Sequence, residues 1–241
     1  MAMRICIMGN SHVACLREAW DTYQDKSDSI ALDFFAAPAT GLAALELKDG
    51  CIGTTDDRVR RSLRITSGGR DSLRLADYDA FLLMDLRVRV PRLVRAISSA
   101  VAAQCSEDAI AASIGLPLGL MVRSQTDASI YVGHAPLFAS DKPQSRLRSY
   151  DELYDVMVAK LDRHGMLLLR QPAETILYPC STHMRFSVGS SRLLPHWRTG
   201  ETLKQPPEDV GHMNSAYGQL FLRDFFQRLN DDRSMGDANR P

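Results

Sequence analysis

The fold is decided by residues 3–23, which read MRICIMGNSHVACLREAWDTY. The apolar run at 3–8 predicts a buried strand, and apolar residues recurring every three or four positions over 13–23 predict a helix. The turn between them, Gly9-Asn10-Ser11-His12, lies at the carboxyl end of the strand, where α/β proteins bind their ligands. We therefore expect the Ser11 hydroxyl to project into a crevice above a sheet.

The same alternation of strand and helix continues along the chain. Residues 45–65, interrupted by Lys48-Asp49-Gly50, predict a small hairpin insertion. Strands that alternate with helices indicate a mostly parallel sheet covered on both faces. We predict a three-layer α/β/α sandwich in one domain over 1–230, with a flexible polar tail at 231–241. The predicted strands are 30–36, 79–84, 129–132 and 176–178, and the predicted helices are 90–104, 107–113, 151–164 and 213–229.

Composition argues against several classes of partner. The chain has 29 Lys and Arg against 29 Asp and Glu, so it carries no net field that would attract nucleic acid. Its five cysteines are widely spaced, without a CxxC or Cys/His cluster, which favours free thiols in a reducing compartment and indicates no metal site. No apolar stretch approaches the roughly 20 residues that span a bilayer, and there is no signal-peptide profile. We expect a cytoplasmic protein without a membrane span or a cofactor, and its oligomeric state stays open.

Two groups of arginines break the charge balance locally. Guanidinium groups bind phosphates and carboxylates in a bidentate manner, so either group could hold an anionic sugar or a phosphate. A solvated arginine-rich face is the alternative interpretation, because exposed charges usually contribute little. The first group is Arg58, Arg60, Arg61 and Arg64, and the second, at near-helical spacing, is Arg87, Arg89, Arg92 and Arg95.

A base and a carboxylate that suit Ser11 occur near the other end of the chain. A serine hydroxyl is a weak nucleophile until a neighbouring base accepts its proton, and that base must be held in one tautomer. In Asp209-Val210-Gly211-His212 the histidine can serve as the base, and the aspartate three residues earlier can orient its ring. The alternatives are a helix N-cap for Ser11, and a capping box or surface pair for Asp209 and His212.

These two blocks resemble those of the SGNH/GDSL hydrolases. Gly9-Asn10-Ser11 matches the family's Gly-Asp-Ser block apart from Asn for Asp, and residues 209–212 match its C-terminal Asp-x-x-His block. The stretch HMNSAYG at 212–218 is also similar. The resemblance implies a flavodoxin-like fold of the SGNH hydrolase type, with Ser11 as nucleophile, His212 as general base and Asp209 as its orienting partner.

The resemblance also implies an oxyanion hole. In the family it is built from the serine N–H, a glycine N–H and an asparagine amide, and such donors are worth ~3 kcal/mol each. Gly41, after the second strand, matches the glycine. Where the family has Gly-x-Asn after the third strand, this chain has Met84-Asp85-Leu86-Arg87. Arg87 or a donor from the long loop at 179–211 is the candidate replacement, and the alternatives are a solvated Arg87 and a site of altered activity.

Further residues are candidates for the pocket. His12 is expected either to line it beside the nucleophile or to be a buried histidine bonded to backbone, and Asn10 is expected to fix the turn. Residues 182–186 and His196-Trp197-Arg198 offer aromatic and charged groups for a sugar or an anionic leaving group. His134-Ala135-Pro136 is a candidate rim element.

The sequence thus predicts a serine-dependent esterase. It would remove an O-acyl group, O-acetyl in the first place, from a carbohydrate or small metabolite through an acyl-serine intermediate. One alternative is an O-acyltransferase of bacterial polysaccharide biosynthesis, which some members of the superfamily resemble. Another is a non-catalytic glycan or nucleotide-sugar binding module, suggested by the missing asparagine. Dinucleotide binding is disfavoured, because Gly9 stands alone where that fingerprint needs three glycines.

Overall fold

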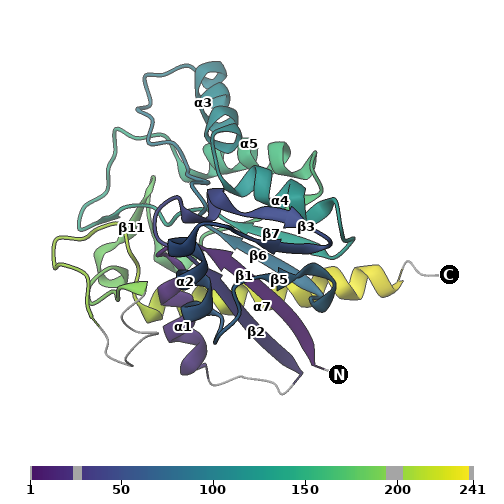
Figure 1. The fold of residues 1–241 in the computed structure, drawn as a ribbon. Coiled ribbons are helices and arrows are strands. Elements are labelled where there is room, and N and C mark those ends of the chain that lie inside the picture. The colour runs from purple at the N-terminus through teal and green to yellow at the C-terminus, as the bar shows by residue number, and fades with distance from the viewer. Residues whose placement is uncertain (1, 24–28, 194–202, 239–241) are drawn as a thin grey trace.

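The centre of the molecule is a five-stranded parallel sheet. The computed structural model describes residues 2–23, 29–193 and 203–238, and Figure 1 draws the fold. The strand order is β2-β1-β6-β7-β9, and each neighbouring pair is parallel. The chain therefore adds β2 on one side of β1 and then crosses over to build the other side. The strands are β1 (Met3–Gly9), β2 (Ile30–Ala36), β6 (Ala80–Met84), β7 (Ser129–Gly133) and β9 (Met166–Leu169).

Helices cover both faces of this sheet (Figure 1). Each face has its own cluster of buried side chains, to which the covering helices contribute. The arrangement is compatible with the predicted three-layer α/β/α sandwich. One face carries α1 (Val13–Asp21) and α7 (Ser215–Ala238), and the other carries α2 (Asp57–Thr66), α3 (Ser99–Ala111), α4 (Gly115–Arg123) and α5 (Tyr150–Asp162).

The central strands are apolar on both sides because both faces of the sheet are covered. Ile5, Cys6, Ile7 and Met8 of β1 are all fully buried. Side chains alternate between the faces of a strand, so Ile5 and Ile7 join the cluster with α1 and α7, whereas Cys6 and Met8 join the other cluster. The continuous apolar run that predicted β1 is therefore the pattern of a strand in the sheet interior.

Two small three-stranded sheets lie outside the central one. The hairpin predicted within 45–65 is confirmed, since β3 (Glu46–Lys48) pairs antiparallel with β4 (Cys51–Gly53), and β5 (Leu73–Arg74) joins β4. The other sheet has the order β10 (Ile176–Leu177), β11 (Ser181–His183) and β8 (Ala139–Ser140). Short 3-10 helices occur at η1 (Gly41–Ala44), η2 (Leu75–Asp77), η3 (Ala173–Thr175) and η4 (Met184–Phe186).

The segment between β6 and α3 differs from the prediction. The helix predicted at 90–104 is wrong, because α3 begins only at Ser99, where the Ser98 hydroxyl accepts a hydrogen bond from the Val101 N–H. Residues 85–98 contain no helix. In this segment Val88 and Val90 are buried while the intervening residue is exposed, so burial alternates at every second position. The arginines at near-helical spacing therefore lie on an irregular loop.

Other elements were placed differently by the prediction. The helix predicted at 107–113 is the C-terminal part of α3, and the strand predicted at 176–178 contributes β10 to a small sheet. Helices α2 and α4 and strand β9 are not in the prediction, and β9 is the fifth strand of the central sheet.

Helix α7 extends to Ala238, into the stretch predicted to be a flexible tail. Asp232 in this stretch accepts a hydrogen bond of 2.8 Å from the hydroxyl of Tyr131 in β7 and pairs with Arg228 one turn earlier. The polar composition that predicted a tail therefore belongs, over 231–238, to the end of a helix docked on the sheet.

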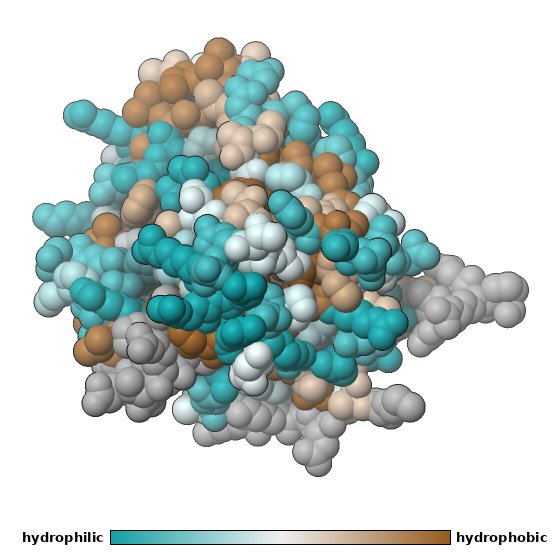
Figure 2. Space-filling model, viewed as in Figure 1, coloured by the Kyte–Doolittle hydropathy of each residue, from teal (hydrophilic) through white to brown (hydrophobic). Residues whose placement is uncertain are grey.

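The space-filling view in Figure 2, taken from the same side as Figure 1, shows hydrophilic side chains over much of the visible surface. A hydrophobic group lies at α3, where Val101 is exposed. In the described part of the chain, no single helix is both long and apolar enough to cross a membrane. Helices α3 and α4, which meet at a bend of 60°, satisfy that length and composition only as a pair.

Candidate active site

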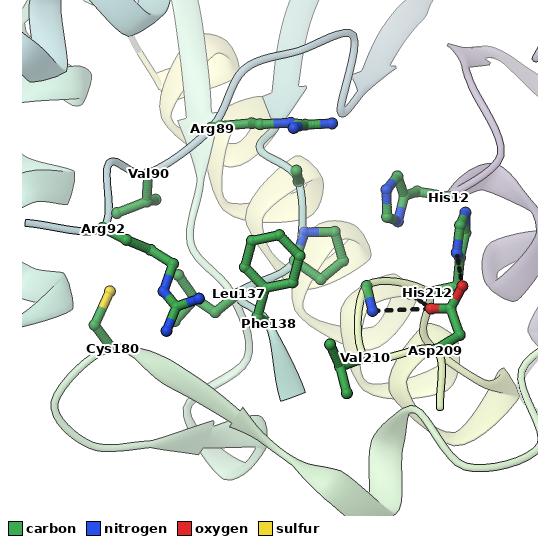
Figure 3. Close-up of a pocket in the computed structure, with 13 residues that line it drawn as sticks. His12, Arg89, Val90, Arg92, Leu137, Phe138, Cys180, Asp209, Val210 and His212 are labelled. Carbon is green, nitrogen blue, oxygen red and sulfur yellow. Dashed lines mark hydrogen bonds and ion pairs between the residues drawn. The ribbon is translucent and has the colours of Figure 1, made fainter. Parts of the chain in front are cut away.

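The predicted nucleophile, base and carboxylate lie together at the carboxyl edge of the sheet. The Oγ of Ser11, in the turn after β1, is 2.8 Å from the Nε2 of His212, although the two residues are 201 positions apart. The Nδ1 of His212 is in turn 2.9 Å from the Oδ2 of Asp209 (Figure 3). Strands β1 and β6 are the neighbours at which the strand order reverses, and open α/β sheets bind ligands at that point. The site lies where the fold favours a binding crevice.

Asp209 holds the His212 ring in one orientation. Its Oδ1 accepts hydrogen bonds from the backbone N–H groups of Gly211 at 2.9 Å and His212 at 2.8 Å, which leaves Oδ2 for the ring. Burial disfavours the charged form of Asp209, but the hydrogen bonds from His212 and Gly211 outweigh burial and lower the pKa of Asp209. A charged Asp209 keeps the proton on Nδ1, so the lone pair of Nε2 faces the Ser11 hydroxyl.

Ser11 does not act as a helix cap. The residue at the N-cap of α1 is His12, and no side chain caps that helix. The Ser11 hydroxyl instead contacts His212, and among the described residues the Ser11 backbone N–H has no hydrogen-bond acceptor. This N–H is therefore an unused donor next to the hydroxyl.

A buried carboxylate, Asp85, joins the turn after β1 to the turn after β6. Asp85 accepts hydrogen bonds from the side-chain amide of Asn10 and from the N–H of Arg87 at 3.0 Å. Its Oδ2 is also 3.2 Å from the Nε2 of His12. A buried carboxylate is costly unless it is hydrogen-bonded, and three donors surround this one. Asn10 thus fixes the turn that carries Ser11, as predicted.

His12 lies between Asp85 and His212. Its ring stacks on the His212 ring, with centroids 4.8 Å apart and planes at 16°. Burial lowers the pKa of His12 to about 4, and the Asp85 charge only partly opposes this, so the ring is neutral near pH 7. With its Nε2–H donated to Asp85, the ring has an acceptor at Nδ1, which is buried and unpartnered among the described residues.

The turn after β6 has a strained backbone. Asp85, Leu86 and Arg87 have φ values of 61°, 43° and 63°, in the left-handed region that residues other than glycine avoid. The Leu86 carbonyl accepts hydrogen bonds from the N–H groups of Ile114 and Gly115, which holds this path. Such strain costs of order 1–3 kcal/mol per residue and clusters at functional sites. Here the strained path of the backbone brings the Asp85 carboxylate into contact with Asn10 and His12.

A cavity of about 380 Å³ lies beside these residues (Figure 3). His12, Asp209 and His212 form one end of it, and Arg89 and Arg92 enter its wall from the loop after β6. The rest of the lining is mostly apolar, so a ligand would be largely desolvated there. These remaining residues are Val90, Ala135, Pro136, Leu137, Phe138, Cys180, Val210 and Gly211.

The two predicted oxyanion donors, Gly41 and Arg87, are not brought to the cavity. The Gly41 N–H donates to the Pro38 carbonyl at 3.0 Å in the tight turn that leads into η1, and Gly41 lines a separate hollow with Val59. Arg87 is exposed and is not part of the cavity lining, and its backbone N–H is bound by Asp85. Of the donors that the resemblance implies, the Ser11 N–H is the one that no described acceptor occupies.

The other predicted pocket residues have mixed positions. Ala135 and Pro136 line the cavity, but His134 is buried, with its Nε2 accepting from the Tyr150 hydroxyl at 2.8 Å. Residues 182–186 form β11 and η4 and do not line the cavity. His196-Trp197-Arg198 lies outside the described residues.

Sequence reasoning missed Asp85 as a partner of Asn10 and His12. It offered Arg89 and Arg92 as members of an anion-binding group at near-helical spacing but did not place them in the wall of this cavity. The signal for the arginines was present in Arg87-Val88-Arg89-Val90, because alternation of charged and apolar residues indicates an extended segment with one buried side. Nothing in the sequence indicated that Phe138 and Cys180 line the same cavity.

The described residues contain no group of three His, Cys, Asp or Glu side chains that could hold a metal ion. All five cysteines are unpaired, and Cys6, Cys15 and Cys180 are buried. No protein-family model matches the chain, and no curated protein matches it significantly. The geometry of the site is therefore the basis on which a function can be proposed.

Proposed function

We propose that this chain is a serine-dependent esterase that removes an O-acyl group, O-acetyl in the first place, from a carbohydrate or small metabolite. The observation that carries the proposal is the hydrogen-bonded series Ser11, His212 and Asp209, of which His212 and Asp209 line one end of a cavity of about 380 Å³. Such a series activates a hydroxyl for attack on a carbonyl carbon. The volume is in the range of small-molecule sites, which favours a small ester over a polymer that is bound along its length.

In the proposed reaction, the Ser11 Oγ attacks the ester carbonyl while its proton passes to the Nε2 of His212. The Asp209 carboxylate stabilises the imidazolium that forms, and the Ser11 N–H donates to the oxyanion. His212 then protonates the departing alcohol, which leaves an acyl-serine. Water, deprotonated by His212, attacks this ester and releases the acid and the free Ser11 hydroxyl.

The resemblance to the SGNH/GDSL hydrolases supports the proposal, and two departures from that family's blocks are consistent with each other. The chain has Asn10 where the family has Asp, and an aspartate in the Met84-Asp85-Leu86-Arg87 stretch where the family has Gly-x-Asn. Asn10 and Asp85 are in contact here. An aspartate at position 10 would face the Asp85 carboxylate, whereas the amide donates to it.

The proposal is tested by hydrolysis of p-nitrophenyl acetate and by labelling with a fluorophosphonate, with the modified peptide identified by mass spectrometry. We expect label on Ser11, and turnover in Ser11→Ala and His212→Ala to fall by several orders of magnitude, as for members of one catalytic unit. The folds of both variants should be retained, as checked by circular dichroism.

Ser72→Ala is the matched control, because Ser72 is exposed and lies outside the cavity lining. Its turnover and labelling should equal those of the parent. If the Ser11→Ala protein hydrolyses the ester as fast as the parent, or the label is found on another residue, Ser11 is not the nucleophile.

A further inference from the structure

The cavity beside Ser11 has an uneven distribution of charge. Two guanidinium groups, those of Arg89 and Arg92, line it, and the one carboxylate in its lining, Asp209, is engaged by His212. Within the described residues neither arginine has an acidic partner, although Arg64 and Arg70 elsewhere are paired with Asp71 and Asp33. The cavity therefore has positive charge that no acidic group in the described part of the chain pairs with.

The backbone that carries these arginines is attached to neighbouring segments. Val88 and Val90 are buried on either side of Arg89, and the Val88 carbonyl accepts a hydrogen bond of 2.7 Å from the Ala135 N–H. Further along, the Leu93 carbonyl accepts from the Arg148 N–H at 2.8 Å. The loop is thus attached at both ends of the stretch that carries Arg89 and Arg92.

The two guanidinium groups lie at different points along the cavity (Figure 3). Arg89 reaches across in the direction of His12, and its charge contributes to the low pKa of His12. Arg92 lies near Cys180, away from His212, with its guanidinium carbon 5.4 Å from the centre of the Phe138 ring. A ligand whose ester lies at Ser11 would therefore have its remaining part within reach of positive charge.

Both arginines are exposed residues, so their guanidinium groups are accessible to a ligand that enters the cavity from solvent. Apolar side chains such as Leu137 and Phe138 line the same space. The planar guanidinium binds carboxylate and phosphate with two parallel hydrogen bonds. A neutral acetyl ester offers neither guanidinium group a charged partner.

We propose that the cavity selects esters that carry a negatively charged group, a carboxylate or a phosphate, which Arg89 and Arg92 bind while the ester carbonyl lies at Ser11. This inference rests on the proposed esterase function and names the class of its substrate.

The test compares kcat/KM for matched pairs of esters. The carboxylate pair is p-nitrophenyl hemiglutarate and the neutral p-nitrophenyl pentanoate, and the phosphate pair is 6-O-acetylglucose 1-phosphate and 6-O-acetylglucose. We expect the parent to prefer the anionic member of at least one pair by tenfold or more, and the pair with the larger preference identifies the anion. In Arg89→Gln/Arg92→Gln this preference should fall to within about threefold of parity.

The control is Arg58→Gln/Arg61→Gln, which removes the same charge from exposed positions of α2 outside the cavity lining. It should keep the parent's preference for anionic esters. If the preference came only from the net charge of the protein, both double variants would lose it equally. Ester turnover that depends on Ser11 but shows no anionic preference, or a preference that survives in Arg89→Gln/Arg92→Gln, overturns this inference and leaves the esterase proposal standing. Absence of turnover with every ester overturns both.

Discussion

Asp85 shows how much of the site depends on one buried side chain. It has no exposed surface, and its donors Asn10, His12 and Arg87 come from both turns that meet at the carboxyl edge of the sheet. Removal of one partner from a buried charge usually costs more than the net worth of the pair, because the remaining charge is left uncompensated. The stability of the protein should therefore fall when a second charge is added to the contact between Asn10 and Asp85.

An exchange of the two side chains tests this pair. Asn10→Asp alone places two carboxylates in contact, and we expect it to lower the free energy of unfolding by about 3 kcal/mol or more. Asn10→Asp/Asp85→Asn restores an amide facing a carboxylate and should recover most of that loss in urea denaturation. The pairing is refuted if the double variant is no more stable than Asn10→Asp.

Asp209 has a smaller expected part in the chemistry than Ser11. Asp209→Asn keeps a side chain of the same shape but removes the charge that holds the proton on the Nδ1 of His212. We expect kcat for p-nitrophenyl acetate to fall by a factor on the order of 10³ to 10⁴, less than in Ser11→Ala. The fluorophosphonate should still label Ser11, only more slowly; undiminished kcat would exclude an orienting role for Asp209.

At the level of elements, close packing of helices depends on glycines that the hydrophobic pattern does not explain. Helices α1 and α7 carry the segments next to Ser11 and His212, and they meet at Gly218. A Cβ built on Gly218 would lie 2.2 Å from the Cys15 carbonyl oxygen, a backbone atom that cannot rotate away. The approach of the two helices, and with it the meeting of the two motifs, requires glycine at this position.

Gly218→Ala should therefore destabilise the protein although alanine is the better helix former. Overpacking of this kind costs about 1–3 kcal/mol, which exceeds the gain in helix propensity of about 1 kcal/mol. Gly53→Ala is the control, because the nearest atom to its Cβ is at 3.4 Å and belongs to the Ser72 side chain. Thermal unfolding of both variants checks this; equal melting temperatures would show that α1 and α7 adjust without cost.

The elements that the sequence predicted well are those whose pattern is set by burial alone. The strand predicted at 30–36 coincides with β2, and the strand and helix over 3–23 are observed as β1 and α1. Helix α4 was missed because Gly115, Pro117 and Gly119 read as breakers, yet Gly119 is where Met166 of β9 packs against the helix. Tertiary contact of this kind is not visible in a local pattern.

At the scale of the whole molecule, the sequence predicted only those parts of the candidate site whose residue types themselves indicate a chemistry. Serine, histidine and aspartate in two short blocks predicted the contact between Ser11 and His212. Gly41 was misplaced because its N–H is used in a local turn. Arg89 and Arg92 could not be placed, because their position depends on the path of the loop after β6 and on its attachment to distant segments.

The pH dependence of stability is also a property of the whole fold. Burial lowers the pKa values of His12 and His134 from 6.5 to about 4, while hydrogen-bonded or charged neighbours, Asp85 and the Ala135 carbonyl, only partly oppose this. Between pH 6.5 and 4 the unfolded chain binds protons at these rings and the folded chain does not, so acid favours unfolding.

We expect the free energy of unfolding to fall as the pH decreases from 6.5 to 4, by on the order of 3 kcal/mol for each histidine. The pKa values of Asp33 and Asp209 are lowered from 3.8, so the stability that these carboxylates contribute is lost only below that pH. Their effect therefore falls outside the window of the histidines. Urea denaturation at several pH values measures the slope. The double variant His12→Gln/His134→Gln should show a much flatter profile over this window, and a parent profile that is already flat would contradict the assignment.

The separation of 201 residues between Ser11 and His212 has a consequence for biosynthesis. During translation the Ser11 hydroxyl leaves the ribosome before His212, the base proposed to deprotonate it, has been made. The proposed reactivity can arise only once α7 docks and brings His212 to Ser11. A nascent or prematurely terminated polypeptide would therefore hold an inert serine, which would leave ester bonds such as the one between a growing peptide and its tRNA intact.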